Sequence, residues 1–161
     1  MCMKTIAITG ASGNLGGLLV KHLLQTTDWE IITFSSNDID KWINNPRIHL
    51  YRNTQILDVF PLLQVDILVH FAFARRFRSN ADIASSLDFS EKVFKAVKNH
   101  TTCRLVNIST VGVYAASEDY MDEDALVGPD TIYGMAKYAS EVLMRSIFEG
   151  VLDRTTNLRL G

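Results

Sequence analysis

The turn between the first apolar run and the first helical pattern carries three evenly spaced glycines. Residues 9–16 read Thr-Gly-Ala-Ser-Gly-Asn-Leu-Gly, which places Gly10, Gly13 and Gly16 three residues apart. Glycine suits a tight strand-to-helix turn, because a side chain there would block the approach of a phosphate to the backbone. The following helix offers free N–H groups and the positive end of its dipole. The turn therefore predicts a dinucleotide-binding loop, and a tight turn without a ligand is the alternative.

The rest of the chain alternates short apolar runs with helix-length patterns. Strands are predicted at Lys4–Thr9, Glu30–Ser35, Arg47–Arg52, Asp66–Phe71, Arg104–Ser109 and Thr155–Leu160. Helices are predicted at Gly13–Gln25, Asp38–Asn44, Gln55–Leu63, Asn80–Asn99 and Asp130–Glu149. Alternating strands and helices imply right-handed crossovers, and strands that are apolar throughout imply a parallel sheet with both faces covered. We therefore expect a doubly wound α/β fold of six strands in the order 3-2-1-4-5-6.

Length and composition narrow the function classes. The 161 residues, of which 47% are hydrophobic, suffice for one domain with a substantial core. A net charge of −2 argues against nucleic-acid and membrane-surface roles, and no apolar run is long enough to span a bilayer. Cys2 and Cys103 make no disulfide framework, and the scattered histidines indicate no metal site. Without a secretory signal pattern, we expect a cytoplasmic protein.

A tyrosine and a lysine are placed for acid/base chemistry on the last long helix. Tyr133 and Lys137 lie four residues apart, so both side chains leave one face of that helix. A free tyrosine has a pKa of about 10, and a neighbouring ammonium lowers the pKa of the phenol toward neutral pH. Such a pair can serve as a general acid and base. The alternative is a pair of residues on a solvated helix face.

Three motifs together resemble the extended short-chain dehydrogenase/reductases, and more narrowly the NAD(P)-dependent epimerase/dehydratase family. They are the glycine-spaced loop at 9–16, the segment Asn-Ile-Ser-Thr-Val-Gly-Val-Tyr at 107–114, and the Tyr-x-x-x-Lys pair. His70-Phe-Ala-Phe-Ala74 is similar to the family's His-x-Ala-Ala segment beside the cofactor. Leu158-Arg-Leu-Gly161 resembles the strand end that leads into the family's substrate lobe. Family members are usually far longer, so we expect residues 1–161 to form one NAD(P)-binding Rossmann-type domain without that lobe.

The resemblance implies roles for individual residues. Thr110 would hold the substrate hydroxyl, with Ser109 as its competitor. Tyr133 would take the proton of that hydroxyl, and Lys137 would assist it and bind the cofactor ribose. The expected cofactor-binding residues are Gly10, Ser12, Gly13, Asn14, Leu15, Gly16, Ser35, Ser36, Asn53, Phe71, Ala72 and Lys137. Asn53 is expected near the adenine. His70 is expected to be a satisfied residue near the core rather than a catalyst.

The end of the second strand bears on the choice of cofactor. NAD-binding members usually carry an acid there for the ribose hydroxyls. This chain has Phe-Ser-Ser-Asn at 34–37 and no carboxylate, which slightly favours NADP. Ser35 and Ser36 could donate to a 2′-phosphate, and Lys41 or Arg47 could approach it; ordinary loop roles are equally open.

Two charged loops follow later strands. A basic cluster comes after the fourth strand, where solvated surface is favoured over phosphate contact; it consists of Arg75, Arg76 and Arg78. An acidic loop precedes the last long helix and is expected to be solvated; it contains Glu118, Asp119, Asp122, Glu123 and Asp124.

The implied activity is hydride transfer at a hydroxyl-bearing carbon of a nucleotide sugar. Dehydratases of the family commonly have Asp-Glu after the motif threonine, whereas Val111 and Gly112 follow Thr110 here. Epimerase or keto-reductase is therefore favoured over dehydratase. A non-catalytic NAD(P)-binding or sensor domain is the main alternative, and a self-associating scaffold is a third.

The resemblance also implies a homodimer, because family members commonly pair through their two long helices. In this chain those helices are the predicted ones at Asn80–Asn99 and Asp130–Glu149. The apolar residues considered for the contact are Phe89, Phe94, Leu143, Met144 and Phe148, some of which must face the sheet.

Overall fold

The computed structural model describes residues 4–36, 42, 44–74, 79–116 and 122–161. Six parallel strands form one sheet in the order β3-β2-β1-β4-β5-β6, so the predicted fold and strand order are confirmed. The strands are β1 (Thr5–Thr9), β2 (Glu30–Ser35), β3 (Ile48–Arg52), β4 (Ile67–His70), β5 (Arg104–Thr110) and β6 (Thr155–Leu160). Each strand end lies within one residue of its predicted position.

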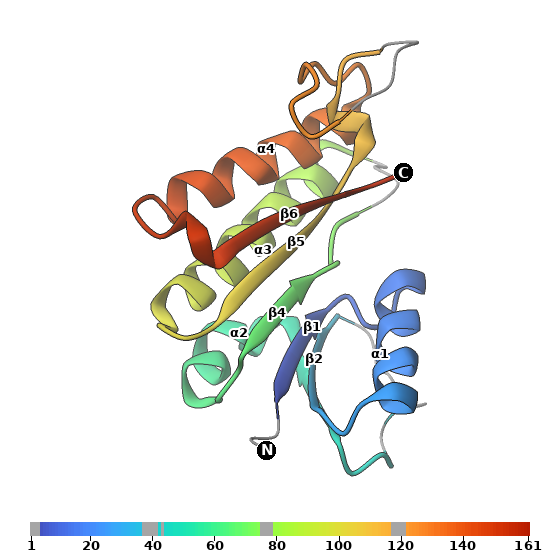
Figure 1. Ribbon diagram of the computed structural model, residues 1–161, viewed down its shortest axis with the longest axis vertical. Helices are drawn as coiled ribbons and strands as arrows, with labels where there is room; N and C mark the ends of the chain where they lie inside the picture. The colour runs from blue at the N-terminus through green and yellow to red at the C-terminus, as the bar shows by residue number, and fades with distance from the viewer. Residues whose placement is uncertain (1–3, 37–41, 43, 75–78, 117–121) are drawn as a thin grey trace.

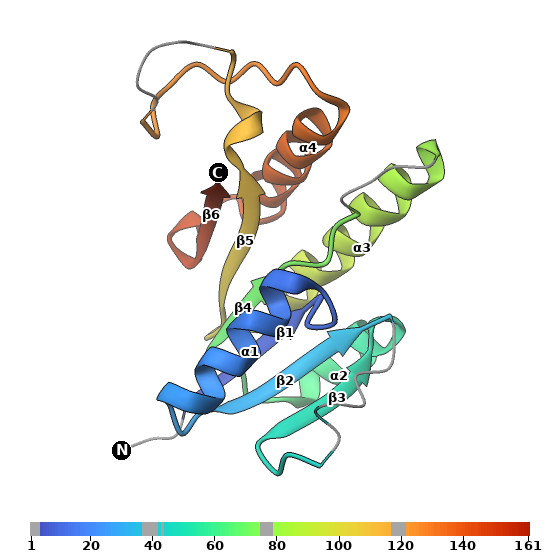
Figure 2. The same cartoon turned by 90° about the vertical axis from the view of Figure 1, so that its right-hand side faces the viewer.

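Helices lie on both faces of this sheet (Figures 1 and 2). On one face α1 (Asn14–Thr26) packs over β1 and β2, and Val20 and Leu23 join Ile8 and Ile31 in one apolar cluster. On the other face lie α2 (Ile56–Val59), α3 (Asn80–Asn99) and α4 (Ile132–Ile147). Their cluster with the sheet is built around four fully buried phenylalanines, Phe34, Phe60, Phe94 and Phe148.

Two helix predictions need comment. The helix predicted at Gln55–Leu63 is wrong in length: α2 covers only 56–59, between 3₁₀ turns at Asn53–Gln55 and Phe60–Leu62. Pro61 explains the break, because proline has no N–H to continue the helical hydrogen bonding. The helix predicted at Asp38–Asn44 lies largely outside the described residues.

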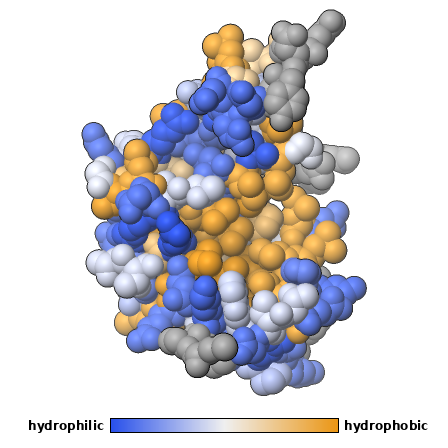
Figure 3. All heavy atoms as spheres, viewed as in Figure 1, coloured by the Kyte–Doolittle hydropathy of each residue, from blue (hydrophilic) through white to orange (hydrophobic). Residues whose placement is uncertain are grey.

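The face that carries α1 is only partly covered. Figure 3, in the view of Figure 1, shows apolar side chains gathered over the middle of this face. Val106, Ile108 and Leu160 belong to the apolar cluster there, and Leu158 is 46% exposed. Among the described residues, no helix combines the length and apolarity needed to cross a membrane.

The strand order sets where a ligand can bind. β2 and β3 are added on one side of β1, whereas β4, β5 and β6 are added on its other side, so the strand order reverses between the neighbours β1 and β4. In open parallel sheets, ligands bind beyond the carboxyl ends of the strands at such a switch point. The glycine loop, residues 71–74 and the 3₁₀ turn Val111–Val113 follow β1, β4 and β5, so all three meet at that edge.

Candidate functional site

The three glycines of the loop differ in why glycine is needed at each position. Gly10 has φ of 72°, and a Cβ there would lie 2.8 Å from the Ala72 backbone nitrogen. At Gly16 a Cβ would overlap the carbonyl oxygen of Gly10. Gly13 differs, because its φ of −77° and ψ of 172° suit any residue and a Cβ would meet only the Gly10 oxygen at 3.3 Å. Gly10 and Gly16 are therefore required by the protein's own packing, whereas Gly13 is open toward the pocket.

The amino end of α1 is left free for an anion. The helix begins at Asn14 after the N-cap Gly13, which provides no side-chain hydrogen bond, and its first turn contains no acidic residue. Asn14 and Leu15 are exposed. The first N–H groups of a helix lack partners within it, and the helix dipole favours negative charge there. This end of α1 therefore fits a phosphate.

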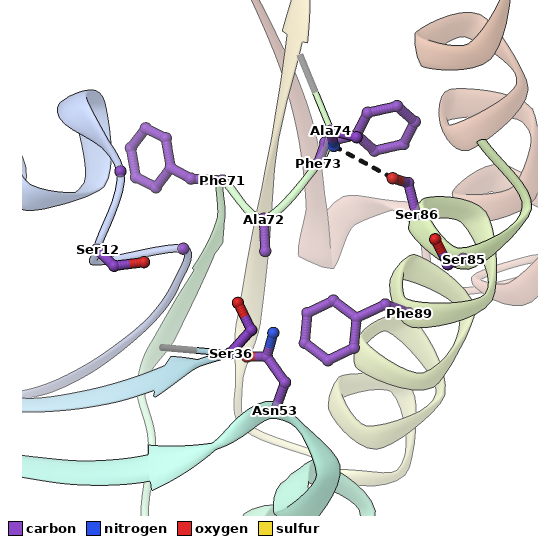
Figure 4. Close-up of a pocket in the computed structure, with 12 residues that line it drawn as sticks. Ser12, Ser36, Asn53, Phe71, Ala72, Phe73, Ala74, Ser85, Ser86 and Phe89 are labelled. Atoms are coloured by element: carbon purple, nitrogen blue, oxygen red, sulfur yellow. Dashed lines mark hydrogen bonds between the residues drawn. The ribbon is translucent and has the colours of Figure 1, made fainter. Parts of the chain in front are cut away.

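A pocket of about 520 Å³ opens beside the glycine loop (Figure 4). It is lined by Gly10, Ser12, Gly13, Ser36, Asn53, Phe71, Ala72, Phe73, Ala74, Ser85, Ser86 and Phe89. Seven of these residues are among the predicted cofactor-binding positions. Sequence reasoning missed Phe73, Ala74 and the three α3 residues, because helical periodicity does not show which side chains border a pocket.

Asn53 supplies an unusual polar group to this pocket. Its Oδ1 is buried and accepts no hydrogen bond from any described residue. A buried acceptor without a donor costs free energy, so such an atom calls for a partner. A ligand with an amino group, such as an adenine, would supply that donor.

The two serines at the end of β2 differ in their exposure to the pocket. Ser35 is 3% exposed, and its hydroxyl donates to Ser12 Oγ at 3.2 Å, so Ser35 lies behind the pocket rather than in its lining. Ser36 is exposed and lines the pocket. The exposed guanidinium of Arg52 donates to the Ser36 carbonyl oxygen at 3.3 Å. Arg52, which sequence reasoning passed over as a cation, thus stands at the pocket rim.

Of the two roles left open for Arg47, the structure supports the ordinary structural one. Its guanidinium donates to the carbonyl oxygens of Thr27 at 2.5 Å and Leu24 at 2.7 Å, at the carboxyl end of α1. Arg47 precedes β3 and so lies at the strand end away from Ser36, because β2 and β3 are parallel. Lys41 and the basic cluster Arg75, Arg76 and Arg78 lie outside the described residues, as do Glu118 and Asp119. Asp122, Glu123 and Asp124 are exposed, as predicted.

His70 is fully buried and held at both ring nitrogens. Ser90 donates its hydroxyl proton to the Ser86 carbonyl oxygen, so its Oγ accepts from His70 Nε2–H at 3.0 Å. Nδ1 therefore accepts from the Thr9 hydroxyl at 2.7 Å. Burial, and next the Lys137 charge, lower the pKa of His70 to about 3, which keeps it neutral. The structure agrees with a satisfied near-core residue.

The hydroxyl groups of Thr9 and Ser86 fix the backbone that follows β4. Ala72 N–H donates to Thr9 Oγ1 at 3.3 Å, and Ala74 N–H donates to Ser86 Oγ at 3.1 Å. The second bond is drawn in Figure 4. The segment 71–74 is therefore tied to β1 on one side and to α3 on the other.

Lys137 is the most constrained cation of the site. It is 3% exposed, and its Nζ donates to the Ile108 carbonyl oxygen at 2.7 Å. Nζ also lies 4.3 Å from the centroid of the Phe73 ring. Burial lowers the pKa of the Lys137 ammonium to about 8, against the opposing effect of the Glu141 carboxylate. The ammonium remains mostly protonated at pH 7.

The first turn of α4 lies close against the end of β5. A Cβ at Gly134 would overlap the Gly112 carbonyl oxygen, so only glycine permits this approach. Thr131 caps the helix by accepting from Gly134 N–H at 3.0 Å. Tyr133, half-buried in this first turn, is thereby brought to the same edge as Thr110.

Ser109 and Thr110 alternate across β5. The Ser109 hydroxyl points toward α4 and donates to Glu141 Oε1 at 2.5 Å. Thr110 Oγ1 accepts from Gly112 N–H at 3.2 Å. The hydroxyl proton of Ser109 is thus donated to Glu141 within the protein, while Thr110 is the last residue of β5.

Glu141 is a buried carboxylate that sequence reasoning missed. It is fully buried, and besides Ser109 it accepts from Arg159 Nε at 3.1 Å and Nη2 at 2.7 Å. These bonds raise the pKa of Arg159. The available signal was its position four residues after Lys137, which places it on the same face of α4. The ion pair joins α4 to β6.

The predicted catalytic residues and the pocket are neighbours but remain separate. None of Thr110, Tyr133 and Lys137 is among the residues that line the pocket. Lys137 lies behind Phe73, which does line it.

The sequence also matches known proteins. The model of the NAD dependent epimerase/dehydratase family matches residues 6–161. The dTDP-glucose 4,6-dehydratase of Haemophilus influenzae is 27% identical over 178 aligned positions, which cover 89% of this chain and 51% of that protein.

Solved structures share the fold. That of dTDP-glucose 4,6-dehydratase from Bacillus anthracis in complex with NAD has a TM-score of 0.83 at 18% identity, covering 97% of this chain and 54% of that one. That of UDP-glucuronic acid 4-epimerase from Bacillus cereus, with UDP-glucuronic acid and NAD, has a TM-score of 0.80 at 24% identity, covering 96% and 55%. The chain thus spans about half the length of the relatives it matches. Since the family model matches nearly all of its residues, this chain belongs to the NAD-dependent epimerase/dehydratase family.

Proposed function

We propose that this chain binds NAD(P) and transfers hydride at a hydroxyl-bearing carbon of a nucleotide sugar. The observation that carries the proposal is the position of Lys137. It is buried at the end of β5, one helical turn after Tyr133, and directly behind the pocket beside the glycine loop. Family membership and relatives that act on nucleotide sugars support the substrate class.

The residues present fit a dinucleotide. The open Gly13 and the free amino end of α1 suit its pyrophosphate, and the unsatisfied Asn53 Oδ1 suits an adenine amino group. Asn14, Leu15 and the buried Gly16 would supply N–H groups of the first helical turn. Phe71 and Ala72 would form the wall that follows β4, and Lys137 would hold the ribose next to the nicotinamide. A bound NAD(P) accepts or returns the hydride.

The protein's own residues would handle the proton. Thr110 would hold the substrate hydroxyl, since the Ser109 hydroxyl is already bound to Glu141. Tyr133 would take the hydroxyl proton as the C–H bond yields its hydride, so that an alcohol becomes a ketone. The cationic Lys137, on the same helix face, stabilises the tyrosine phenolate.

Within this chemistry we propose an epimerase or keto-reductase rather than a dehydratase. Val111 and Gly112 stand where the family's dehydratases commonly carry Asp-Glu, so a carboxylate pair for water elimination is missing at those positions. The similarity to a dehydratase at 27% identity supports the family and not that particular reaction.

One observation favours a second candidate, a non-catalytic NAD(P)-binding or sensor domain. In the structure Lys137 does not line the pocket, and the Phe73 ring lies against its ammonium. Titrating NADH and NADPH by fluorescence, and then adding UDP-glucuronic acid or dTDP-glucose to the NAD⁺ and NADP⁺ forms, separates the two. Substrate-dependent reduction of bound cofactor supports the enzyme; tight binding without reduction by any nucleotide sugar supports the sensor.

Replacing Gly13 by valine should weaken dinucleotide binding about tenfold or more, which is about 1.4 kcal/mol. The branched side chain would fill the space at the amino end of α1, while the backbone there accepts any residue. NADH titration measures the loss, and thermal unfolding checks that the fold is kept. As a matched control, Gly16→Ala should lower thermal stability, because its Cβ overlaps Gly10. Unchanged affinity in Gly13→Val would refute the assignment.

We further propose a modest preference for NADP over NAD. No carboxylate occupies the described end of β2, and the Arg52 guanidinium stands beside Ser36 at the pocket rim. Ser36→Asp should shift the affinity ratio toward NADH by about tenfold, since it repels a 2′-phosphate. Arg52→Ala should weaken NADPH binding more than NADH binding. Ser35→Asp would be a poorer test, because Ser35 is buried. A parent chain that binds NADH tenfold more tightly than NADPH would contradict the preference.

We also propose a homodimer through α3 and α4. Phe94, Met144 and Phe148 are buried against the sheet and cannot contribute. Helical spacing instead aligns an exposed apolar stripe along α4, formed by Ile132, Met135, Ala139 and Val142. The double variant Met135→Glu, Val142→Glu should be monomeric by light scattering at concentrations where the parent is dimeric. Leu62→Glu, at another exposed position, is the control. A monomeric parent at high micromolar concentration would contradict the dimer.

A further inference from the structure

Phe73 contacts both the pocket and Lys137. Phe73 lines the pocket, and its ring centroid lies 4.3 Å from Lys137 Nζ. Lys137 is 3% exposed. In Figure 4 the ring points away from Ser12 and Phe71, which border the other end of the pocket. The aromatic face attracts the ammonium and at the same time shields it from the pocket.

The backbone of Phe73 is held on both sides. Ala72 N–H is bound by Thr9 Oγ1, and Ala74 N–H is bound by Ser86 Oγ. Thr9 is in turn held by the buried His70. Both flanking residues are tied down, so the exposure of Lys137 requires rotation of the Phe73 side chain rather than movement of the segment.

We propose that Phe73 is a positioning residue for Lys137 and an aromatic gate between the dinucleotide pocket and the catalytic side chains. The proposal rests on the proposed function. With the gate closed, the ring holds the ammonium against the Ile108 carbonyl oxygen. A dinucleotide binds fully only to molecules in which the ring has already rotated away, because only then can its ribose reach Lys137. The apparent affinity for the dinucleotide is therefore the affinity of the open form multiplied by the fraction of molecules in which the gate is open.

Reactivity of Lys137 with an amine-selective reagent tests whether the Phe73 ring shields its ammonium, and the test does not depend on catalytic activity. A short pulse of N-hydroxysuccinimide acetate on the full chain, read by peptide mass spectrometry, gives the acetylation rate of Lys137 relative to the exposed Lys21. Phe73→Ala should raise that rate about tenfold, if the gate is open about a tenth of the time in the parent. Phe73→Tyr, which keeps the ring, should leave the rate low. Phe89→Leu, in the same pocket but not over Lys137, is the matched control.

Stopped-flow binding of NADH and NADPH tests the gate itself. Phe73→Ala should bind about tenfold faster and more tightly than the parent, whereas Phe89→Leu should not bind faster. If Phe73→Ala is unstable, Phe73→Val, a smaller truncation, is measured in its place. An unchanged acetylation rate of Lys137 in the truncated variant would show that the Phe73 ring does not shield Lys137. Weaker dinucleotide binding without faster association makes Phe73 an ordinary pocket wall and overturns the gate. If neither the parent nor the variant binds either dinucleotide, the proposed function itself fails.

Discussion

Replacing Tyr133 by phenylalanine should lower the rate of cofactor reduction about 100- to 10,000-fold, the usual loss when a general base is removed. The change deletes one oxygen from a half-buried residue in the first turn of α4 and leaves the pocket lining intact. NADH and NADPH affinities should therefore stay close to those of the parent. The measurement is a single-turnover assay of bound NAD(P)⁺ with the nucleotide sugar found in the substrate screen.

Three companion variants separate the proposed roles. Lys137→Ala should reduce both the rate and the cofactor affinity, because Lys137 is assigned to the phenolate and to the ribose. Thr110→Ala should reduce the rate with little effect on affinity, and Ser109→Ala should mainly affect stability, since Ser109 serves Glu141. A parent-like rate in Tyr133→Phe would rule out the mechanism and favour the non-catalytic binding domain.

Replacing Glu141 by alanine should lower the free energy of unfolding by about 3–5 kcal/mol, the range for removing one partner of a buried ion pair. Arg159 would keep its charge without its carboxylate, and the Ser109 hydroxyl would lose its acceptor. Urea denaturation of the parent and the variant measures the difference. The variant should also have a lower Lys137 pKa than the parent value of about 8, because the Glu141 carboxylate favours the ammonium.

The double variant Glu141→Leu, Arg159→Met is the control for this interpretation. A buried ion pair replaced by apolar residues is often neutral or stabilising, so the double variant should recover most of the lost stability. A Glu141→Ala variant as stable as the parent would show that the pair contributes little. Double and single variants of equal stability would show that the loss comes from packing rather than from the stranded charge.

The sequence by itself determined the strand order, the loop at the switch point and the helix face that carries Tyr133 and Lys137. The elements follow from local periodicity and from the positions of glycine, and the strand order follows from the topology that alternating strands and helices adopt. Helix ends were less predictable: Pro61 divided a predicted helix, and α4 began at Ile132 rather than Asp130.

The tertiary structure decided the properties that depend on contacts between distant segments. At Gly10 part of the need for glycine comes from Ala72, which lies close to it only in the folded protein. Likewise, the use of Ser109 by Glu141 and the cover of Phe73 over Lys137 join residues 32 and 64 positions apart. Sheet register and helix packing bring such residues together, and no local pattern encodes either one. The sequence therefore determined the elements and their order, while the packing between the layers decided which side chains are engaged in contacts within the protein.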